Sequence, residues 1–417
     1  MGPQISHSTS GQTDKANQAT SRTVILAGSF VVFFGLLVII ELFSLVFFQV
    51  TKDLPAFRLR VSYPVELTTS EIQSYLMVRD ENLGWPPTNA KYLSKSTHGE
   101  RFSPANKSIE HSKYCMEVYG DSFTFSSDVD DYAAWPNQIT EKTKCKVLNF
   151  GVGGYGVDQA VLRHQLNDRF SDHATLVIYP DDITRNLNQH RSLISAYKNQ
   201  LDFKPRFVLS GAGGLKYIGP FRGKLGEYKK ALEYPEQSLH HERFLPETSA
   251  ILSKVIPSFP FSLSLFRFGR RLYREIDFET IRTGEIRRGL SGTNFVTYHF
   301  SNEKLAIEAK LILERLVDLF QGNCRKKKQT CFVVLLPDLD YLEGSERATL
   351  LIDYYFQNIR NTGSYFDMVQ FLRSEMKGQF CRYIKSDNCW GHFNESGYEI
   401  VSKYFAREFS DIFSKKM

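Results

Sequence analysis

Four short segments of the sequence contain side chains that perform acyl-transfer chemistry in proteins. The first is G-D-S-F-T, which contains Asp121 and Ser122 and follows an apolar run that begins at Tyr114. A serine at the end of a strand, beside the first turn of a helix, lies where backbone N–H groups can hold an anion. Ser122 is therefore the candidate nucleophile, and we expect Asp121 to contact the substrate or the oxyanion.

A histidine in the last segment supplies the base that such a serine needs. His392 belongs to the run D-N-C-W-G-H-F-N-E-S-G-Y, just before the last predicted helix. In a Ser–His pair the imidazole removes the hydroxyl proton and later returns it to the leaving group. We expect His392 to be the general base and Asp387, the nearest acid, to orient its ring.

The two middle segments contain groups that bind a substrate or an oxyanion. One is N-F-G-V-G-G-Y-G, whose glycines allow a close backbone approach, although it lacks the Lys-Ser/Thr of a Walker A loop. The other is P-D-D-I-T-R-N, which contains Asp182, Arg185 and Asn186. Asp182 and Arg185 either fix a sugar or a loop, or form a structural ion pair.

The apolar runs beside these segments predict an alternation of strands and helices. Strands are expected at 114–118, 146–150, 175–179, 331–336 and 381–385, and helices at 132–142, 157–170, 305–319, 346–360 and 396–413. We expect Ser301 to cap the third helix and Gly322 to stop it. This α/β pattern predicts a three-layer α/β/α sandwich with a central parallel sheet of about five strands. Ligands bind at the carboxyl edge of such a sheet, where the four segments should meet.

The rest of the chain divides by composition. Residues 1–22 are rich in Ser, Thr, Gln and Asn and are predicted to be a disordered cytoplasmic tail. Residues 51–113 read as an irregular stalk, and residues 114–417 as the α/β domain with an insertion at about 188–300. The insertion contains a basic segment, Arg267 to Arg274. That segment either touches a membrane surface or an acidic glycan, or is the solvated face of a helix.

One apolar run, residues 23–50, is long enough to cross a membrane. A bilayer core of ~30 Å needs ~20 apolar residues in a helix. The run lacks the small-residue cleavage site of a secretory signal, so we expect an uncleaved anchor. The α/β domain would then be extracytoplasmic, on the periplasmic side of a bacterial inner membrane. Glu41 interrupts the run, and either has a function, lies near the outer leaflet, is protonated, or faces a partner helix.

All six cysteines follow the apolar run, which suits an oxidising compartment. The pairs 324/331 and 381/389 are close enough to close short loops. Cys115 and Cys145 each precede a strand-like run, and would lie side by side at a sheet edge. We expect disulfides, with six reduced and buried cysteines as the alternative.

Composition argues against several partners. The net charge of +6 is mild, and no dense Lys/Arg stripe with interleaved aromatics predicts nucleic-acid binding. The ten histidines show no metal-ligand spacing, so we expect neither a metal nor another cofactor.

Together the four segments resemble the SGNH/GDSL hydrolase family, which is named for separate blocks bearing Ser, Gly, Asn and His. The resemblance covers roughly residues 114–413 and is interrupted by the insertion. The family's serine falls on Ser122, its second-block glycine on Gly154 and its histidine on His392. What the resemblance implies is an oxyanion hole built from the backbone N–H groups of Ser122 and Gly154.

The third block departs from the family pattern, which usually reads G-x-N-D with its Asn completing the oxyanion hole. Asp181 and Asp182 occupy that stretch here, and a carboxylate would repel an oxyanion. Either Asn186 or Asn149 supplies the donor, or Asp181 is protonated, or the site is weak. The D-D-x-x-R-N run is also similar to a subgroup of membrane-anchored bacterial SGNH proteins associated with surface polysaccharides.

The last block departs as well, because the family usually has an Asp three residues before the histidine. Cys389 stands there, and Asp387 lies five residues before His392. Asp387 orients the imidazole only if the loop bulges, through a Cys381–Cys389 bridge for example. A Ser–His dyad is the alternative.

The function expected from this resemblance is ester chemistry on an extracytoplasmic carbohydrate or lipid-linked glycan. The enzyme would remove or transfer an O-acetyl or similar acyl group, with a multi-span acyl donor protein as a further partner. The alternatives are a catalytically weak glycan-binding or assembly subunit of a surface polysaccharide system, and a lipid esterase.

Overall fold

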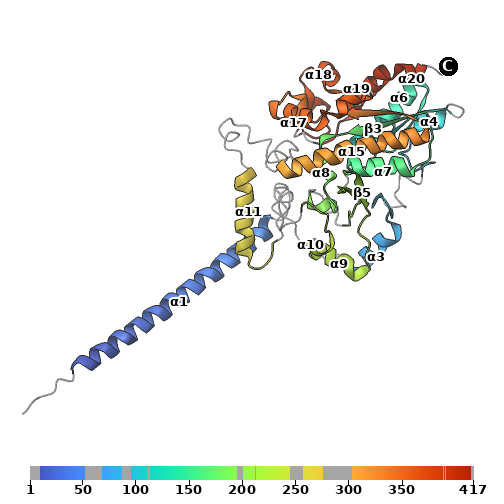
Figure 1. The fold of residues 1–417 in the computed structure, drawn as a ribbon. Helices are drawn as coiled ribbons and strands as arrows, with labels where there is room; N and C mark the ends of the chain where they lie inside the picture. Colours follow the sequence, from blue (N-terminus) through green and yellow to red (C-terminus); the bar gives the residue numbers. More distant parts are fainter. Residues whose placement is uncertain are drawn as a thin grey trace, which may run out of the picture.

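A long N-terminal helix leads to an α/β domain with a smaller group of elements beside it (Figure 1). This arrangement is seen in a computed structural model of the chain. The residues that it describes are 10–51, 68–86, 95–109, 113–194, 201–211, 213–244, 257–275, 303–387, 389 and 391–414.

A five-stranded parallel sheet with the order β2-β1-β3-β6-β7 forms the centre of the domain. Its strands are β1 (Tyr114–Tyr119), β2 (Lys146–Asn149), β3 (His173–Ile178), β6 (Thr330–Leu335) and β7 (Tyr365–Asp367). Every residue of β2 is buried, and so are all but the first residues of β1 and β3. Such continuous burial is typical of parallel strands that are covered on both faces. The predicted α/β class and parallel sheet are confirmed.

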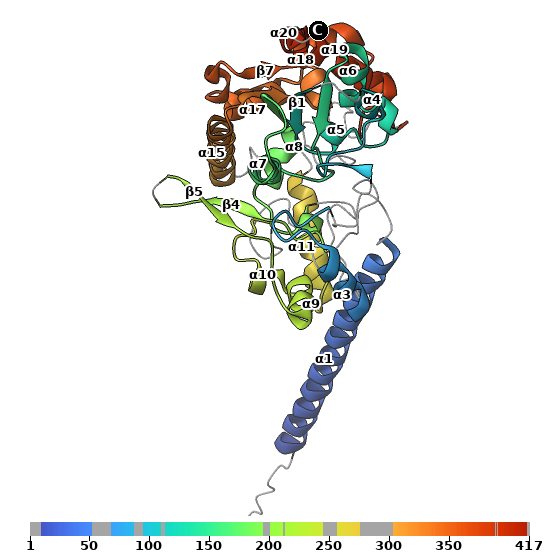
Figure 2. The ribbon, with the colours of Figure 1, turned by 90° about the vertical axis from the view of Figure 1, so that its right-hand side faces the viewer.

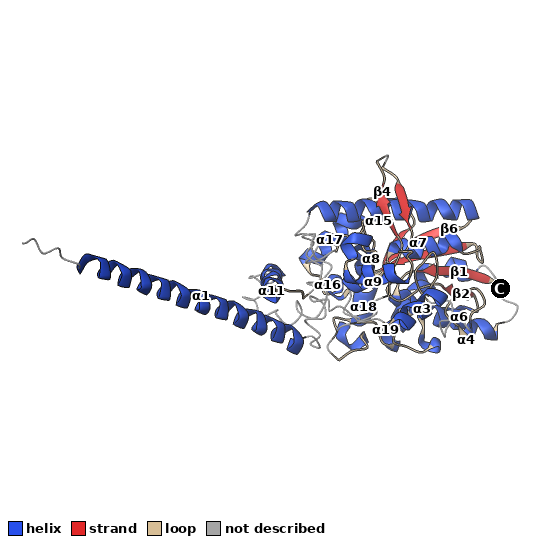
Figure 3. Cartoon of the chain, turned by 90° about the horizontal axis from the view of Figure 1, so that it is seen from below, coloured by secondary structure: helices blue, strands red, loops and turns tan. Residues whose placement is uncertain are grey.

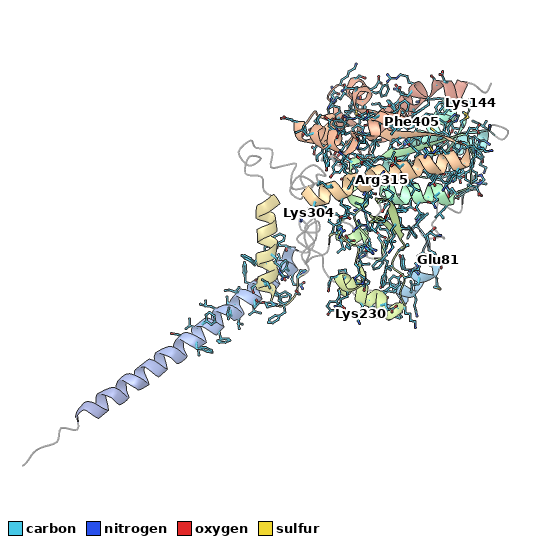
Figure 4. The ribbon with its side chains drawn as sticks, in the orientation of Figure 1. Glu81, Lys144, Lys230, Lys304, Arg315 and Phe405 are labelled. Atoms are coloured by element: carbon cyan, nitrogen blue, oxygen red, sulfur yellow. A yellow bond between two sulfur atoms is a disulfide. The ribbon has the colours of Figure 1, made fainter. Side chains whose placement is uncertain are left out.

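Helices cover both faces of the sheet and make the predicted three layers (Figures 1 and 3). Helices α7 (Val157–Leu166) and α15 (Glu303–Lys327) pack together on one face. On the other face α6 (Trp135–Thr143) packs against α19 (Glu395–Glu408). The rings of Trp135 and Phe405 stack there with centroids 4.4 Å apart. Figure 4 labels Phe405 among the side chains of this part of the domain.

Within the described residues, the domain contains seven further helices of 4 to 11 residues. They are α4 (Pro104–Ser108), α5 (Ser122–Phe125), α8 (Pro180–Arg185), α16 (Leu339–Leu342), α17 (Glu346–Phe356), α18 (Val369–Met376) and α20 (Ser410–Ser414). Short 3₁₀ turns occur at η2 (Asp131–Ala133), η3 (Arg191–Leu193), η4 (Ile359–Thr362) and η5 (Phe380–Tyr383).

Two predicted elements need correction. The fifth strand is β7, whereas the predicted strand at 381–385 is largely the 3₁₀ turn η5. β7 has only three residues, all half-buried, which is too short for a periodic pattern to reveal. Helix α15 also runs past Gly322 to Lys327, because Cys324 is buried in the core and Lys327 Nζ donates to the Asn167 carbonyl over 2.6 Å. The predicted cap Ser301 lies outside the described residues.

A smaller group of elements has an apolar cluster of its own (Figure 2). Its helices are α3 (Thr69–Val78), α9 (Leu225–Glu233) and α10 (Pro235–Ser238). Beside them lies the antiparallel hairpin β4 (Arg206–Leu209) and β5 (Leu215–Ile218), whose Phe207 packs in the main core instead. Ile72 of α3 and Tyr228 of α9 are fully buried in this cluster. Part of the predicted stalk therefore packs on part of the predicted insertion, while the domain limits themselves stay a prediction.

The N-terminal helix α1 (Ser10–Thr51) contains the apolar run and projects away from the domain (Figure 1). Its stretch Gly28–Thr51 has 24 residues and is long and apolar enough to cross a membrane. One helix of the insertion, α11 (Phe261–Glu275), packs against it. The helix that the sequence predicts at residues 23–50 is confirmed as an apolar helix.

The six cysteines form three disulfides, as expected. They join Cys115 to Cys145, Cys324 to Cys331, and Cys381 to Cys389. The Cα–Cα distances are 5.8, 6.1 and 4.7 Å, within the ordinary range for a disulfide. The first bridge ties β1 to its neighbour β2, and the last one closes the loop before His392.

A buried histidine makes the stability of this fold sensitive to acid. The His164 ring is fully buried between the rings of Tyr119 and Phe320, with Nε2 3.0 Å from Gln329 Oε1. Burial lowers the pKa of His164 from 6.5 to about 4. Between these values the unfolded chain binds a proton that the folded chain does not, so stability is present above pH 6.5 and is lost as the pH falls toward 4.

We therefore expect His164 alone to remove roughly 3 kcal/mol from the free energy of unfolding between pH 6.5 and pH 4. Urea unfolding at several pH values measures this loss. The variant His164→Gln keeps a partner for Gln329 without a titrating group, and should show a flatter profile. Parent and variant profiles with the same slope in this window would contradict the assignment.

Candidate active site

The four predicted segments meet at the carboxyl edge of the sheet. The amide of Val152 donates to the Gly120 carbonyl over 3.1 Å, which joins the first two segments. Arg185 of the third segment lies 3.2 Å from Asp121 of the first. The ring of Phe123 packs against His392 of the fourth, with centroids 5.0 Å apart. Segments far apart in the sequence therefore form one site, as parallel-sheet topology requires.

Ser122 is the first residue of the short helical turn α5. The Asp121 carboxylate caps this turn by accepting the N–H groups of Phe123 at 2.9 Å and Thr124 at 3.4 Å. Among the residues that the structure describes, no group accepts the Ser122 N–H, so it is available to an oxyanion. The Ser122 side chain is only 7% exposed, and its Oγ lies 3.4 Å from Asp121 Oδ2.

The turn that bears Ser122 fits closely against the second segment. An added Cβ at Gly151 would lie 2.7 Å from both the carbonyl carbon and the Cβ of Thr124. Real Cβ atoms do not approach so closely, so only glycine allows this contact. The glycine-rich segment therefore positions the nucleophile turn directly.

His392 is held by Asp128, a residue that sequence reasoning missed. Its Nδ1 lies 2.7 Å from Asp128 Oδ2, and its side chain is 20% exposed. With Nδ1 donating to a carboxylate, Nε2 is the ring nitrogen that can take a proton. Asp128 thus has the orienting role that an acid plays in a Ser–His–Asp triad.

A buried arginine builds the loop that presents Asp128. Arg101 Nη1 donates to the carbonyls of Phe125 and Ser126 at 2.5 and 2.6 Å, and Nη2 donates to Val129 at 2.7 Å. The loop reverses through two left-handed residues, Ser126 at φ 64° and Asp128 at φ 66°. No periodic pattern in the sequence indicates such a turn, which explains why Asp128 was not predicted.

The structure does not bring Asp387 to His392 as the sequence suggested. Asp387 is exposed, and the hydrogen bond that His392 Nδ1 makes within the described part of the chain goes to Asp128. The Lys385 amide donates to the His392 carbonyl over 2.9 Å, which places Asp387 in the turn between them. The Cys381–Cys389 bridge closes this turn but does not direct the acid toward the imidazole.

Arg185 and Asp182 form a buried ion pair. Arg185 Nη1 donates to Asp182 Oδ1 at 2.7 Å and to the Tyr155 carbonyl at 2.9 Å. Their side chains are only 8% and 2% exposed. This geometry favours the structural interpretation over a direct sugar contact, because Arg185 links the third segment to the first two.

Asp181 occupies the place of the family's Asn. A third of its side chain is exposed, and Oδ2 lies 3.6 Å from Arg185 Nη2. Burial raises the pKa of Asp181, while Arg185 and Arg191 lower it and Asp121 raises it. The 33% exposure of the Asp181 side chain limits the effect of burial on this pKa.

The two predicted substitute donors differ in their bonding. Asn149 Nδ2 donates to the Phe125 carbonyl over 3.3 Å, so it is engaged in holding the nucleophile turn. Asn186 is fully buried and its Oδ1 accepts the Asp158 amide at 3.0 Å. Its Nδ2 has no partner within the described ranges. Asn186 is therefore the better candidate donor of the pair.

Gly154 lies beside two residues that were not predicted. It has φ +80°, and an added Cβ would lie 3.6 Å from the Trp85 ring and 3.7 Å from Arg191 Nε. Trp85 Nε1 donates to the Gly153 carbonyl at 2.9 Å, and its ring packs on Tyr155 with centroids 5.8 Å apart. An aromatic ring from the N-terminal extension therefore borders the glycine-rich segment. The oxyanion role of the Gly154 amide stays a prediction.

Arg191 adds a positive charge to this side of the site. Its side chain is half-buried, and none of the described residues forms a hydrogen bond or ion pair with its guanidinium. Burial and the nearby Arg185 charge lower the pKa of Arg191 to about 9, against the opposing effect of the acids Asp181 and Asp202. A cation without a partner beside an aromatic ring can bind a polar substrate group.

No protein-family model matches the sequence, and no curated protein matches it. In the described residues, no group of three or more His, Cys, Asp and Glu side chains could hold a metal ion. The structure thus establishes the parallel α/β fold. The resemblance to SGNH hydrolases rests on the four sequence segments and on their positions at the carboxyl edge of the sheet.

Proposed function

We propose that the chain is a membrane-anchored serine hydrolase or acyltransferase of the SGNH type. The observation that carries this proposal is the contact of His392 with both the nucleophile turn and an acid. Its ring packs on Phe123, the neighbour of Ser122, while its Nδ1 lies 2.7 Å from Asp128 Oδ2. A serine with a free backbone amide, an imidazole and an orienting acid are the parts that acyl transfer needs.

In the proposed reaction His392 Nε2 takes the proton of the Ser122 hydroxyl as the oxygen attacks an ester carbonyl. The tetrahedral intermediate then collapses to an acyl-enzyme, and the imidazolium gives the same proton to the departing alcohol oxygen. Water regenerates the enzyme by the reverse sequence and releases the acid. If a sugar hydroxyl attacks instead, the acyl group is transferred to the sugar.

The substrate that this site supports best is an O-acylated carbohydrate or lipid-linked glycan. The half-buried Trp85 provides an aromatic face beside Gly154, and Arg191 provides a donor for hydroxyl or carboxylate oxygens. Aromatic rings and planar guanidinium groups are suited to such polar, ring-shaped ligands. The low exposure of Ser122, 7%, favours a small acyl group such as acetyl.

The location that we propose is the extracytoplasmic face of a membrane, with α1 as the anchor. The stretch Gly28–Thr51 is long enough to span, and the three disulfides suit an oxidising compartment. A multi-span protein that carries an acyl donor across the membrane would be a natural partner if the enzyme is a transferase.

A second candidate is a catalytically weak glycan-binding subunit. It is favoured by Asp181 in place of an Asn donor, and by the 7% exposure of Ser122, whose Oγ faces the Asp121 carboxylate. Such a subunit would bind acylated glycans without turning them over.

Hydrolysis of p-nitrophenyl acetate by the full-length protein in detergent separates the two candidates. We expect Ser122→Ala and His392→Ala each to lower kcat by at least about 10³-fold, because the two residues act as one unit. Ser374→Ala, a change to an exposed serine on α18, serves as the matched control. A parent protein that hydrolyses the ester no faster than Ser122→Ala would favour the binding subunit.

A further inference from the structure

A carboxylate within the apolar helix α1 is bonded to the first turn of helix α11. Glu41 Oε2 accepts the Phe261 N–H at 2.6 Å, and Oε1 accepts the Ser262 N–H at 3.2 Å together with the Ser262 hydroxyl. The first N–H groups of a helix lack partners within the helix and carry partial positive charge. Glu41 therefore caps α11 from another helix, and both of its carboxylate oxygens accept hydrogen bonds.

Helix α11 begins at the depth of the middle of the apolar stretch. Glu41 lies ten residues before the end of α1 at Thr51. At 1.5 Å per residue this is roughly 15 Å, half of a ~30 Å bilayer core. This step rests on the anchor role that we propose for α1. With α1 across the membrane, the N-terminus of α11 lies near the bilayer centre.

The two helices are in contact and cross at a wide angle, since Figure 3 shows α1 along its length and α11 nearly end-on (Figures 1 and 3). Seven residues after the capping contact, Phe268 packs on Phe47 and Phe48, with ring centroids 6.0 and 6.4 Å away. Between these contacts Ser44 and Ser264 are almost fully buried. Small side chains at such positions let two helices approach closely, as in membrane helix pairs.

The other face of α11 is apolar where it runs beside the apolar part of α1. Leu263 and Phe266 on α11 are 46% and 66% exposed, and Phe259 just before the helix is 77% exposed. These values are comparable to those of Phe43 and Val46 on α1. Side chains this large and apolar are rarely left in water together. Nothing in the described part of the chain covers them, whereas lipid would cover them at the depth set by Glu41.

Basic residues follow in the second half of α11, a helix of 15 residues. Its sequence places arginines at 267, 270, 271 and 274. Arginines at the headgroup level of a bilayer pair with lipid phosphates.

We propose that α11 is a half-helix inserted in the extracytoplasmic leaflet and docked on α1 through Glu41. Lipid acyl chains cover Phe259, Leu263 and Phe266, and the arginine-rich second half lies at the headgroups. The chain thus enters the membrane twice, which would fix the height and tilt of the α/β domain above the bilayer. The contact of α11 with lipid does not depend on whether the α/β domain is an enzyme.

Single introduced cysteines in the full-length protein test this placement, because all six native cysteines are in disulfides. The protein would be reconstituted in phosphatidylcholine–phosphatidylglycerol liposomes and reacted with a membrane-impermeant maleimide. Leu263→Cys and Phe266→Cys should react at least about ten-fold more slowly than Tyr132→Cys, whose parent side chain is 68% exposed on the domain. Labelling of Leu37→Cys in α1 tests whether α1 itself lies in the membrane, in which case this cysteine should also be protected.

The labelling results distinguish failure of the half-helix assignment of α11 from failure of the anchor assignment of α1 on which it rests. If Leu37→Cys is protected but Leu263→Cys reacts like Tyr132→Cys, the anchor stands and the half-helix is wrong. If Leu37→Cys also reacts freely, α1 does not span and the half-helix falls with it. Neither result depends on esterase activity, so failure of the proposed chemistry is measured separately.

Two further measurements test whether lipid or a second copy of the chain covers the apolar face of α11, and whether Glu41 holds α11 on α1. A fluorescent bimane on Leu263→Cys should be quenched by lipids brominated in the acyl chain. Protection without quenching would mean that a second copy of the chain covers this face, and would overturn the lipid assignment. In the Glu41→Leu background α11 loses its cap, and the labelling rate of Leu263→Cys should rise several-fold. An unchanged rate would overturn docking through Glu41.

Discussion

Replacing Asp128 by Asn should lower kcat for ester hydrolysis by about 10²- to 10³-fold, whereas Asp387→Asn should leave it within about two-fold. Asp128 Oδ2 lies 2.7 Å from His392 Nδ1, while Asp387 is exposed in the turn before it. An amide at position 128 no longer holds the Nδ1–H tautomer or stabilises the imidazolium. Loss of the acid from a buried triad costs about 10⁴-fold, and we expect less here because Asp128 is 54% exposed and water can partly replace it.

The comparison of the two variants is decisive because both remove one carboxylate from a loop near His392. Rates of p-nitrophenyl acetate hydrolysis and urea unfolding midpoints would be measured for both, so that a loss of activity is separated from a loss of fold. Equal rates for Asp128→Asn and the parent, or a larger loss in Asp387→Asn, would show that Asp128 does not orient the base.

The second large effect concerns stability, and it follows from a buried lysine. Lys204 Nζ lies 2.5 Å from Asp158 Oδ2 and also donates to the carbonyls of Arg185, Asn188 and Pro205 at 2.9–3.1 Å. Both charged side chains are essentially unexposed. Removing one member of such a pair leaves an uncompensated buried charge, so Lys204→Met should reduce the free energy of unfolding by about 3–5 kcal/mol.

Urea unfolding of the parent, Lys204→Met and the double variant Asp158→Asn/Lys204→Met measures this effect. The double variant contains no unpaired charge and should recover part of the lost stability. Because Lys204 also holds the carbonyl at the end of α8, Lys204→Met should lower esterase activity in the folded protein as well. A single variant that is as stable as the parent would contradict the buried pair.

The sequence predicts the fold well where apolar runs are long. β1, β2, β3 and β6 are each within about two residues of their predicted ends, because fully buried parallel strands leave an unbroken apolar signal. β7 was missed because its three half-buried residues give no such signal. The predicted end of α15 at Gly322 was wrong because burial of Cys324 and the bonds of Lys327 outweigh the low helix propensity of one glycine.

The site was predictable only in part, for a physical reason. Ser122, the glycine-rich segment and His392 directly border strands or helices, so topology alone brings them to one edge. Asp128 depends on two left-handed residues and on the bonds of Arg101, which no periodicity reveals. Trp85 and Arg191 come from the N-terminal extension and the insertion, regions whose packing against the sheet the sequence does not indicate.

Glu41 illustrates how structure selects among interpretations that the sequence leaves open. A carboxylate in an apolar run could have had several roles, including contact with a partner helix. The helix that it contacts is α11 of the same chain, through two backbone amides and the Ser262 hydroxyl. Since main-chain groups leave no residue-specific trace in the sequence, composition alone could not have identified this partner.

Labelling of the full-length protein with a fluorophosphonate, followed by peptide mapping, tests the central claim most directly. The account predicts a covalent adduct on Ser122, which is lost in Ser122→Ala and slowed by at least about 10²-fold in His392→Ala, because a serine without its base is a poor nucleophile. A folded parent protein that does not label, or an adduct on another serine with Ser122→Ala labelling normally, would contradict a Ser122–His392 catalytic site.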